Sequence, residues 1–314
     1  MRILMFGRGV VASVYGWAFA RAGHDVEYYV RPGRAREYGD AVDLELTDLR
    51  RRPWAPVLRE RSVTILREDL ASDDGFDLVI VSVSHHRLAE AARLLAPSVG
   101  SATVLVLGNV WPEPAAAVAP LPADQVVLGF PGAGGGVQPD GTLRAGLTSS
   151  VRLGVTGGAT RAREQAVRGL FRDAGFRVRE ESDLAGWLAV HFVADVGIHA
   201  QGLRLGTLSR LPGDTPALKE AMRTSRELLP VLEARGVDLG RHRAMTASFR
   251  HPGAAGTALA WITAHVAPAR ISMEAHVDPL AEEPRAVCRD ALAEARRLGV
   301  PVPRLERVEA LFAV

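Results

Sequence analysis

The sequence predicts an α/β protein in two parts, a doubly wound parallel sheet over residues 1–180 and an all-helical C-terminal domain over residues 181–314. Two patterns support this division. Short apolar runs alternate with helical periodicity through the first part, as strands and helices do around a mostly parallel sheet. From Asp183 onward, apolar residues recur at helical spacing almost throughout. With 314 residues and 47% hydrophobic residues, the chain is long enough for two domains with a buried core.

The first strand runs directly into a glycine turn. The apolar run Met1–Phe6 precedes a G-x-G-x-x-A sequence, a helical pattern that Gly23 ends, and a second apolar run at residues 26–30. In such a unit, the first glycine permits the tight turn, the second lets the backbone approach a pyrophosphate, and the alanine lets the helix pack on the strand. The phosphates would meet amides at the helix N-terminus. Instead of an ordinary glycine-rich turn, this order favours a Rossmann-type dinucleotide site at Gly7, Arg8, Gly9, Val10, Val11 and Ala12.

The end of the second strand selects the dinucleotide. An NAD site places Asp or Glu there to hold the ribose 2′-hydroxyl, whereas a 2′-phosphate needs an arginine. This chain has Arg31, followed by Arg34 and Arg36, and Glu37 lies too far along to replace a strand-end carboxylate. Guanidinium groups bind phosphate through paired, charge-assisted hydrogen bonds. A cluster of solvated arginines is the alternative, and the pattern favours NADP(H).

The other strands and helices follow from the same two periodicities. In the first part we expect strands at 77–83, 102–107, 126–130, 151–155 and 176–179, helices at 86–95 and 160–174, and a glycine-rich loop at 131–136. In the second part we expect helices at about 184–205, 216–236, 239–248, 255–266 and 281–299. Gly299 and the prolines beyond it end the last of these.

Charge, apolar content and cysteine count limit the classes of function that the chain can have. A net charge of +2 gives no strong attraction to nucleic acid, although the isoelectric point is near 9. No apolar run approaches the ~20 residues of a membrane span, and the N-terminus reads as a strand, so we expect a cytoplasmic protein without membrane partners. Cys288 is the single cysteine, which excludes an intrachain disulfide and a cysteine metal cluster, and no metal site is expected. Of the 38 basic residues, Lys219 alone is a lysine.

Four further segments resemble the ketopantoate reductase (2-dehydropantoate 2-reductase) family. The strand ending in Gly108-Asn109 resembles the family's strand that ends in Gln/His-Asn-Gly, with Val110 in place of the glycine. The segment 130–136 with Asp140-Gly141 occupies the place of the family's small-residue loop near the nicotinamide. Ser272-Met273 resembles its Ser-Ser-Met, and Glu282-Glu283 with the helix that follows resembles its Thr-Glu and last long helix.

The resemblance implies a fold, a cofactor and roles for particular residues. It implies a Rossmann domain that binds NADPH and a helical domain that completes the active site. A small-molecule substrate is the expected partner, and a homodimer is a further possibility. Asn109 would lie beside the nicotinamide ribose and the substrate, Ser272 near the substrate carboxylate, and Glu283 in the catalytic network. Ser84 stands where the family often has a lysine that touches the cofactor, and Val137 follows the small-residue loop, so both are assigned to the cofactor site.

The family's catalytic lysine is missing. In the family this lysine, the general acid toward the ketone, lies on the first helix of the second domain with two asparagines one and two turns on. Anchoring the alignment on Trp187 puts Ala189 at the lysine position and Val193 and Gly197 at the asparagine positions. In this register the helix would carry none of the family's catalytic side chains.

A register shifted by two residues places polar side chains at the same spacing. His191, Asp195 and His199 recur at i, i+4 and i+8, and drift by only about 80° around a helix. Burial of His and Asp without a function is costly, so we favour this register over the first. His191 would then replace the lysine as general acid, Asp195 would raise its pKa and orient its ring, and Asp195 and His199 would contact substrate. The alternative is a set of interhelical hydrogen-bonding residues or a dimer contact.

The sequence therefore favours an NADPH-dependent reductase that transfers hydride to a 2-oxo acid or a related carbonyl or imine. Two other functions are weighed. Loss of the lysine favours a catalytically inactive NADPH-binding sensor or partner protein, whereas retention of Asn109, Ser272 and Glu283 opposes it. A hydroxyacid dehydrogenase of the 6-phosphogluconate dehydrogenase type shares the domain layout but also uses a lysine on the linker helix, which this chain lacks.

Overall fold

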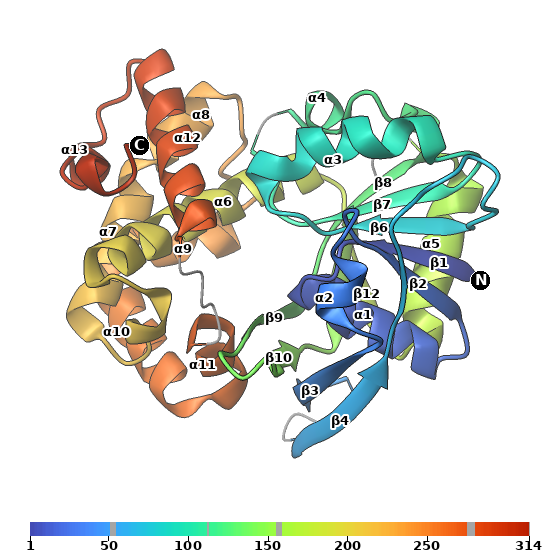
Figure 1. Ribbon diagram of the computed structural model, residues 1–314. Coiled ribbons are helices and arrows are strands. Elements are labelled where there is room, and N and C mark those ends of the chain that lie inside the picture. The colour runs from blue at the N-terminus through green and yellow to red at the C-terminus, as the bar shows by residue number, and fades with distance from the viewer. Residues whose placement is uncertain (51–54, 112, 155–158, 275–279, 314) are drawn as a thin grey trace. The chain divides into compact units, whose positions relative to one another are not determined.

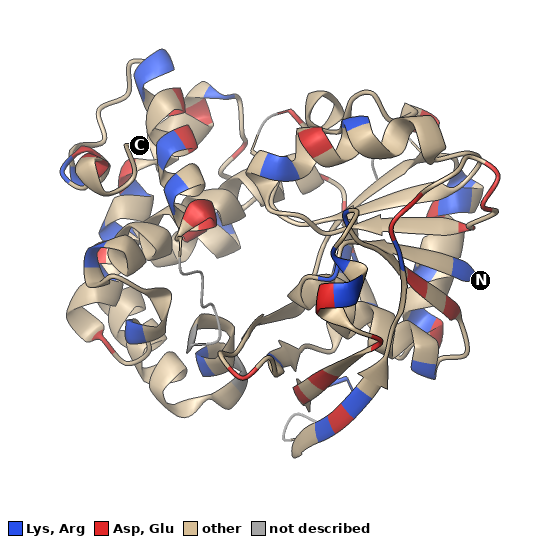
Figure 2. Ribbon diagram, in the orientation of Figure 1, with Lys and Arg blue, Asp and Glu red and all other residues tan. Residues whose placement is uncertain are grey.

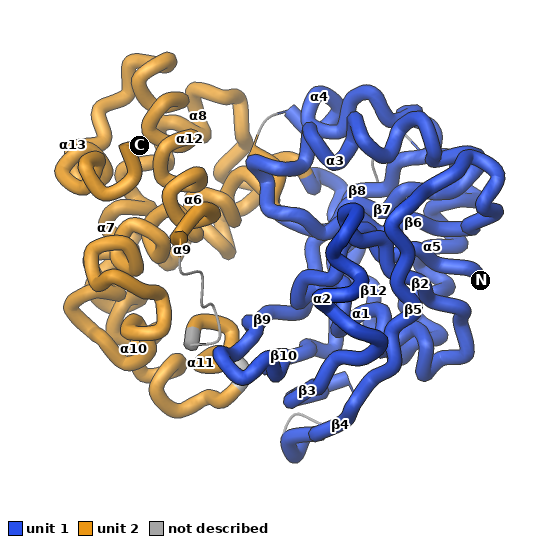
Figure 3. The backbone as a smooth tube through the Cα atoms, in the orientation of Figure 1, with its two compact units in different colours: residues 1–108, 112–184 blue, residues 109–111, 185–314 orange. Residues whose placement is uncertain are grey.

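The computed structural model describes residues 1–50, 55–111, 113–154, 159–274 and 280–313. The chain divides into two compact units, drawn in different colours in Figure 3. Unit 1 comprises residues 1–108 and 112–184, and unit 2 comprises residues 109–111 and 185–314. The short segment 109–111 therefore leaves the sheet-containing unit and belongs to the helical one.

An eight-stranded sheet forms the centre of unit 1, with strand order β12-β11-β8-β7-β6-β1-β2-β5. Its strands pair in parallel except for β8 and β11, which are antiparallel. The mostly parallel sheet predicted from the sequence is confirmed. The strands are β1 (Arg2–Phe6), β2 (Asp25–Tyr29), β5 (Ile65–Arg67), β6 (Leu78–Val81), β7 (Thr103–Leu107), β8 (Val126–Phe130), β11 (Ser150–Gly154) and β12 (Arg177–Glu181).

Helices cover both faces of this sheet (Figure 1). On one face, α1 and α5 share a core in which Tyr15 and Phe19 pack against Phe171 and Phe176. Burial on both faces explains why β6 and β7 are continuous apolar runs rather than alternating ones. The helices of the unit are α1 (Val10–Arg21), α2 (Ala35–Tyr38), α3 (Leu88–Leu95), α4 (Pro114–Val118) and α5 (Arg161–Asp173), with short 3-10 turns η1 (His85–Arg87), η2 (Ala96–Ser98) and η3 (Ala123–Gln125).

A second sheet of four strands, in the order β4-β3-β10-β9, was not expected from the sequence. Its strands are β3 (Ala41–Asp48), β4 (Val57–Val63), β9 (Ala133–Val137) and β10 (Leu143–Leu147). The glycine-rich segment 131–136 is therefore not only a loop, because residues 133–136 pair with β10. Its glycines are required by close approach: a Cβ atom at Gly135 would overlap the backbone of Arg144 and Ala145. Strand propensity is low for glycine, which is why the pattern indicated a loop.

Residues of both charge signs are interspersed along the helices and strands of each unit (Figure 2). Along β4, Arg59, Glu60 and Arg61 follow one another, and Arg59 and Arg61 pair with Glu45 and Asp43 of β3. Helix α10 (Pro252–His265) contains no Lys, Arg, Asp or Glu. This mixture fits the small net charge of +2.

Unit 2 is helical. It contains α6 (Leu184–Leu205, which starts at the last residue of unit 1), α7 (Thr215–Glu227), α8 (Leu229–Ala234), α9 (Arg243–Arg250), α10, α11 (Ala267–Glu274), α12 (Glu282–Arg297) and α13 (Pro303–Glu306), with 3-10 turns η4 (Leu208–Arg210) and η5 (Glu309–Leu311). The single helix expected at 216–236 is divided into α7 and α8 next to Pro230, whose ring nitrogen has no N–H to donate. Helix α11 was missed, since proline and mixed polarity weaken its pattern.

The central helix of unit 2 is α6, which packs closely on α7 at Gly197. A Cβ atom at this glycine would overlap the carbonyl oxygen of Ala221 and the hydroxyl of Ser225. Around it, Val190, Phe192, Val193 and Val196 are fully buried in a core shared with α12. The small residue lets two helix backbones approach, and the apolar neighbours fill the space on either side.

In the part of the chain that the structure describes, no helix combines the length and the apolar character that a bilayer span requires. Among the same residues, no three His, Cys, Asp or Glu side chains converge in a way that could hold a metal ion.

The packing at Gly197 makes a stability prediction with a matched control. Gly197→Ala should lower the free energy of unfolding by about 1–3 kcal/mol, because the added methyl group overpacks the contact between α6 and α7. Gly253→Ala places the same methyl group on α10 of the same unit, where nothing lies within 4 Å. This control should leave stability unchanged or raise it by up to about 1 kcal/mol. Urea unfolding followed by tryptophan fluorescence measures both; equal effects would contradict the packing account.

Candidate functional site

The turn between β1 and α1 leaves open space over two glycines. Gly7 has φ of +102°, a conformation that side-chain-bearing residues rarely adopt, and its amide donates to the carbonyl of Tyr29. A Cβ atom built on Gly7 or Gly9 meets nothing within 4 Å. Gly9 is the N-cap of α1 and no side chain caps it. Uncapped amides beneath open space fit a bound pyrophosphate.

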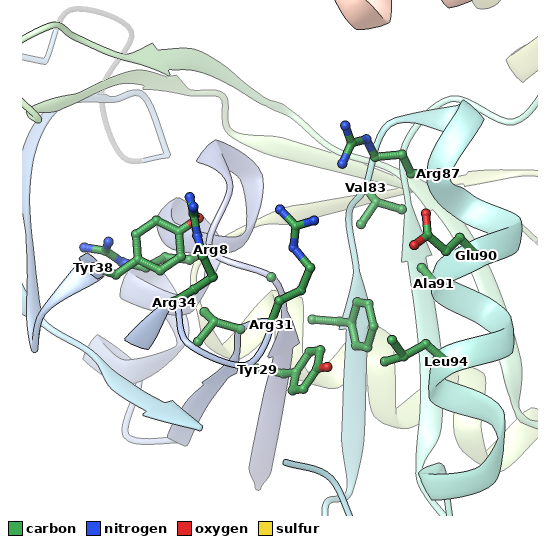
Figure 4. Close-up of a pocket in the computed structure, with 13 residues that line it drawn as sticks. Arg8, Tyr29, Arg31, Arg34, Tyr38, Val83, Arg87, Glu90, Ala91 and Leu94 are labelled. Atoms are coloured by element: carbon green, nitrogen blue, oxygen red, sulfur yellow. The ribbon is translucent and has the colours of Figure 1, made fainter. Parts of the chain in front are cut away.

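A pocket of about 170 Å³ lies beside this turn (Figure 4). It is lined by four arginines, by one carboxylate and by a set of mainly apolar residues. The arginines are Arg8, Arg31, Arg34 and Arg87, the carboxylate is Glu90, and the remaining lining residues are Phe6, Gly7, Tyr29, Val30, Tyr38, Val83, Ala91 and Leu94. The cationic excess suits a phosphate, and the apolar wall suits the flat face of a base.

Two of these arginines are held against one tyrosine. The guanidinium carbons of Arg8 and Arg34 lie 5.0 and 5.1 Å from the ring centre of Tyr38. Arg8 also donates to the carbonyl of Ala41 at 2.6 Å, and Arg34 pairs with Glu37 at 2.8 Å. Burial lowers the pKa of Arg8 from its ordinary value. Arg31 is exposed, and the described residues record no ion pair for its side chain.

The structure brings together only some of the predicted cofactor residues. Gly7, Arg8 and Arg31 line the pocket. Gly9 and the first turn of α1, with Val10, Val11 and Ala12, follow these lining residues in the sequence. Ala12 lies within α1 and is buried. Ser84 follows Val83, a lining residue, and caps η1. Val137 ends β9 in the smaller sheet and is half exposed, and Asn109 belongs to unit 2.

Asn109 reaches the helical unit because the residues after it are anchored there. The ring of Trp111 stacks on Phe192 of α6, with ring centres 4.4 Å apart and planes at 18°. The guanidinium of Arg235 lies 4.1 Å from the Trp111 ring and donates to its carbonyl oxygen at 2.6 Å. Both faces of the tryptophan are thus contacted by unit 2, and this fixes the short segment that carries Asn109.

Asn109 joins His191 and Asp195 in a three-membered network. Its Nδ2 donates to Asp195 Oδ2 at 2.6 Å, so its Oδ1 faces the other way and lies 3.3 Å from His191 Nδ1. His191 Nδ1 is also 3.3 Å from Asp195 Oδ2. Because both neighbours of Nδ1 are acceptors, this nitrogen is assigned as the donor. The His191 and Asp195 side chains are 27% and 26% exposed.

The network holds the carboxylate of Asp195 ionised. Burial alone would raise the pKa of Asp195, but the opposing charge and hydrogen bond of His191, the charge of His199 and the hydrogen bond from Asn109 lower it to about 2. The ring of Trp187 stacks on His191 from the preceding turn of α6, with ring centres 5.2 Å apart. His191 is therefore held by a stacked ring on its face and by two acceptors at Nδ1.

The opposite face of α6 carries the residues of the alternative register. Ala189 and Val193 are buried in the core of unit 2, and Gly197 packs against α7. His191 and Asp195 lie instead on the partly exposed face, with Asn109. The two-residue shift in the alignment thus corresponds to opposite faces of the helix, as expected from a turn of about 200° per two residues.

The remaining predicted site residues lie elsewhere in unit 2. His199 is buried, one turn beyond Asp195 on α6. Ser272 is exposed on α11, and its hydroxyl donates to the carbonyl of Ala269 at 2.9 Å. Glu283 lies in the first turn of α12, after Ala281, a non-glycine residue with φ of +51°. An alanine in this left-handed conformation is strained, so the backbone is strained where α12 begins.

Sequence reasoning did not identify several residues of these two sites. Tyr38, Arg87 and Glu90 of the arginine pocket carry no motif, and their spacing gave no signal. Trp111 and Arg235 act through tertiary contact, which one sequence cannot show. The stacking of Trp187 on His191 could have been found, because aromatic residues at i and i+4 on a helix meet.

Chemically, unit 2 offers an imidazole whose Nδ1 is fixed by two acceptors, which directs Nε2 to the opposite side of the ring. With Nδ1 held in this way, Nε2 is the ring nitrogen that can exchange a proton with a substrate. Unit 1 offers a phosphate-binding turn and an arginine pocket.

Comparison with known proteins gives sequence matches over part of the chain and structural matches over its full length. Residues 3–157 match the family described as ketopantoate reductase PanE/ApbA. A 2-dehydropantoate 2-reductase of Halobacterium salinarum is 27% identical over 256 residues, which cover 76% of this chain and 77% of that protein. The crystal structure of the 2-dehydropantoate 2-reductase from Geobacter metallireducens GS-15 gives a TM-score of 0.66 at 18% identity, covering 100% of this chain and 99% of the other.

A second kind of enzyme shares the fold. The ternary structure of D-mandelate dehydrogenase with NADH and anilino(oxo)acetate gives a TM-score of 0.72 at 13% identity, covering 100% of this chain and 97% of that chain. At such identities the solved structures show the fold alone. They confirm the α/β class with a parallel sheet and a helical C-terminal region.

The lowered pKa of Asp195 predicts a pH-dependent loss of stability. The folded-state pKa of about 2 lies below the ordinary value of 3.8, so the carboxylate stabilises the fold above pH 4 and loses this contribution as the pH falls through 2. The contribution is about 2 kcal/mol. Asp195→Asn should therefore be less stable than the wild type at pH 6, and the difference should shrink near pH 2. Urea unfolding at both pH values, with a carbon NMR titration of the carboxyl group, tests this; a pKa near 4 would contradict it.

Proposed function

Because the chain belongs to the ketopantoate reductase family, we propose that it is an NADPH-dependent reductase that transfers hydride to a 2-oxo acid or a related carbonyl or imine. The single observation that carries the proposal is the network of His191, Asp195 and Asn109, which supplies a positioned proton donor on a helix without lysine. A reductase needs such a donor, because the carbonyl oxygen gains a proton as its carbon gains hydride.

The residues of unit 1 fit NADP(H). The open glycine turn would hold the pyrophosphate, and the arginine pocket would hold the 2′-phosphate and one face of the adenine. Tyr38 keeps the guanidinium groups of Arg8 and Arg34 in place, so these side chains lose little conformational entropy when phosphate binds. The D-mandelate dehydrogenase structure contains NADH, but here an arginine rather than a carboxylate follows the second strand. This difference favours NADP(H).

The roles of the residues follow from their contacts. Bound NADPH supplies the hydride. His191 delivers a proton from Nε2 to the substrate oxygen, while its Nδ1–H stays bonded to Asp195 and Asn109. Asp195 orients the ring through Nδ1, and Trp187 holds the ring plane. We assign Asn109 to the ribose and substrate, Ser272 and His199 to the substrate, and Glu283 to the catalytic network, as the family resemblance implies.

The proposed substrate is a compound with a carboxylate next to the reacting carbonyl. The anilino(oxo)acetate bound by the D-mandelate dehydrogenase has an oxo group next to a carboxylate, and the curated relative is named for a 2-oxo acid reductase activity. Both support a 2-oxo acid here. Self-association into a homodimer and a cytoplasmic location stay predictions.

A catalytically inactive NADPH-binding protein is the second candidate. One observation favours it: α6 carries histidine where the family's catalytic lysine is expected. The two candidates differ in one result. The reductase oxidises NADPH when a suitable 2-oxo acid is added, whereas the binding protein retains NADPH affinity with no turnover.

Cofactor selection should depend on Arg31. Arg31→Asp should weaken NADPH binding by about thirtyfold or more, which is about 2 kcal/mol, because a charge-assisted phosphate contact is replaced by repulsion. NADH binding should change little. Arg36→Asp introduces the same charge change five residues on, outside the pocket lining, and serves as the control. Calorimetric titration with both cofactors measures the effect; equal weakening of NADPH and NADH would refute the phosphate assignment.

The proton-donor role of His191 predicts a loss of turnover without a loss of cofactor affinity. His191→Ala should reduce kcat by about 10²–10⁴-fold and leave the Kd for NADPH nearly unchanged. Asp195→Asn should shift the pH–rate profile rather than abolish activity, since it removes a charge beside His191 but leaves the proton donor in place. Steady-state kinetics across pH, with fluorescence titration of NADPH, separates these effects. A His191→Ala enzyme with near wild-type kcat would contradict the assignment.

A further inference from the structure

Unit 2 contains a cavity of about 190 Å³ that the proposed mechanism does not use. It lies where α6 ends, between η4 and the start of α12. Gly206, with φ of +82°, ends α6, and Leu208 packs over the backbone of Gly202. The chain therefore folds back on the last turn of α6 and leaves a hollow bounded by Ala281 and Pro284 on the other side.

The chemistry of the lining is that of a pocket for an apolar chain with one polar end. Leu203, Leu208, Leu280 and Leu311 supply apolar wall, and Arg285 supplies a cation. The described residues provide no acceptor for the buried Nε of Arg285. A buried guanidinium nitrogen without an acceptor is costly, so a ligand that supplies one would be favoured.

Other arginines of the same helix have carboxylate partners. Arg289 lies 3.7 Å from Asp290, Arg296 lies 2.7 Å from Glu309, and Arg297 lies 2.7 Å from Glu294. Arg285 lines the cavity, and no carboxylate among the described residues forms an ion pair with it. The contrast identifies Arg285 as the cation of α12 that is available to a ligand.

Helix geometry connects this cavity to His191. Gly202 follows His191 by eleven residues, which corresponds to about three turns and a rotation of only ~20°. Asp195 and His199 lie between them on the same face of α6. The distance along the helix is about 16 Å, which is the span between His191 and the cavity that an extended substrate has to bridge.

We propose that the cavity receives the distal end of an extended substrate, so that the enzyme acts on 2-oxo acids with an apolar arm that ends in a carboxylate bound by Arg285. The inference rests on the proposed reductase function and adds the substrate class to it. The leucine wall would bind the arm, and the distal carboxylate would supply the acceptor that Nε of Arg285 lacks among the described residues.

The test is a series of 2-oxo dicarboxylates, from 2-oxoglutarate to chains of about twelve carbons, which approach the ~16 Å span. Each is compared with the 2-oxo monocarboxylate of equal length in the wild type, Arg285→Leu and the control Arg289→Leu. For the wild type, kcat/KM should rise with length and favour the long dicarboxylates. Arg285→Leu should lower kcat/KM for these by about 10–100-fold, mainly through KM, and leave short substrates within about twofold. Arg289→Leu should change neither.

A binding experiment separates this inference from the reductase function. Dodecanedioate cannot be reduced, and calorimetry should show that it binds the wild type, binds Arg285→Leu at least tenfold more weakly, and competes with the long 2-oxo acids. If the wild type reduces 2-oxo acids with no preference for length, or Arg285→Leu affects short and long substrates alike, the substrate class is wrong. Binding of dodecanedioate without competition would identify a separate effector site and overturn the inference. If no 2-oxo acid is reduced although NADPH binds, the reductase function itself fails.

Discussion

The site in unit 2 depends on one constraint, the placement of a carboxylate on an otherwise largely apolar helix. Asp195 lies on α6 between residues that fill the core, and such a charge is tolerated only with partners that satisfy it. His191 supplies an imidazole nitrogen from the preceding turn, and Asn109 supplies a donor from a segment 86 residues earlier. The contacts of Trp111 hold Asn109 beside Asp195, and the pKa of Asp195 is lowered because His191 and Asn109 are both in place.

Close packing of backbone makes that arrangement possible. Because Gly197 brings α7 against one face of α6, the apolar side of the helix is fully covered and the polar side is left partly exposed. In unit 1, glycine has the opposite use: the space over Gly7 and Gly9 stays open. One unit thus uses glycine to exclude a side chain from a packed interface, and the other uses it to admit a ligand to the backbone.

Strong local patterns allowed much of the fold to be predicted from the sequence. The alternation of apolar runs with helices gave the parallel sheet, and apolar periodicity placed the helix at residues 184–205, where α6 lies. The smaller sheet was missed because β9 is rich in glycine and β4 is rich in charge, so neither shows an apolar alternation. The grouping of His191 with Asp195 was visible in their spacing, whereas their contact with Asn109 depends on Trp111 and Arg235 meeting across the tertiary fold.

The central claim is that the chain transfers hydride to a 2-oxo acid, and isotope transfer tests it most directly. The protein is incubated with NADPH deuterated at C4, separately on each face of the ring, and with 2-oxo acids that include 2-dehydropantoate. With one of the two deuterated forms of NADPH, mass spectrometry should find one deuterium at C2 of a 2-hydroxy acid product. Saturable NADPH binding with no deuterium in any product would contradict the claim and favour a binding protein.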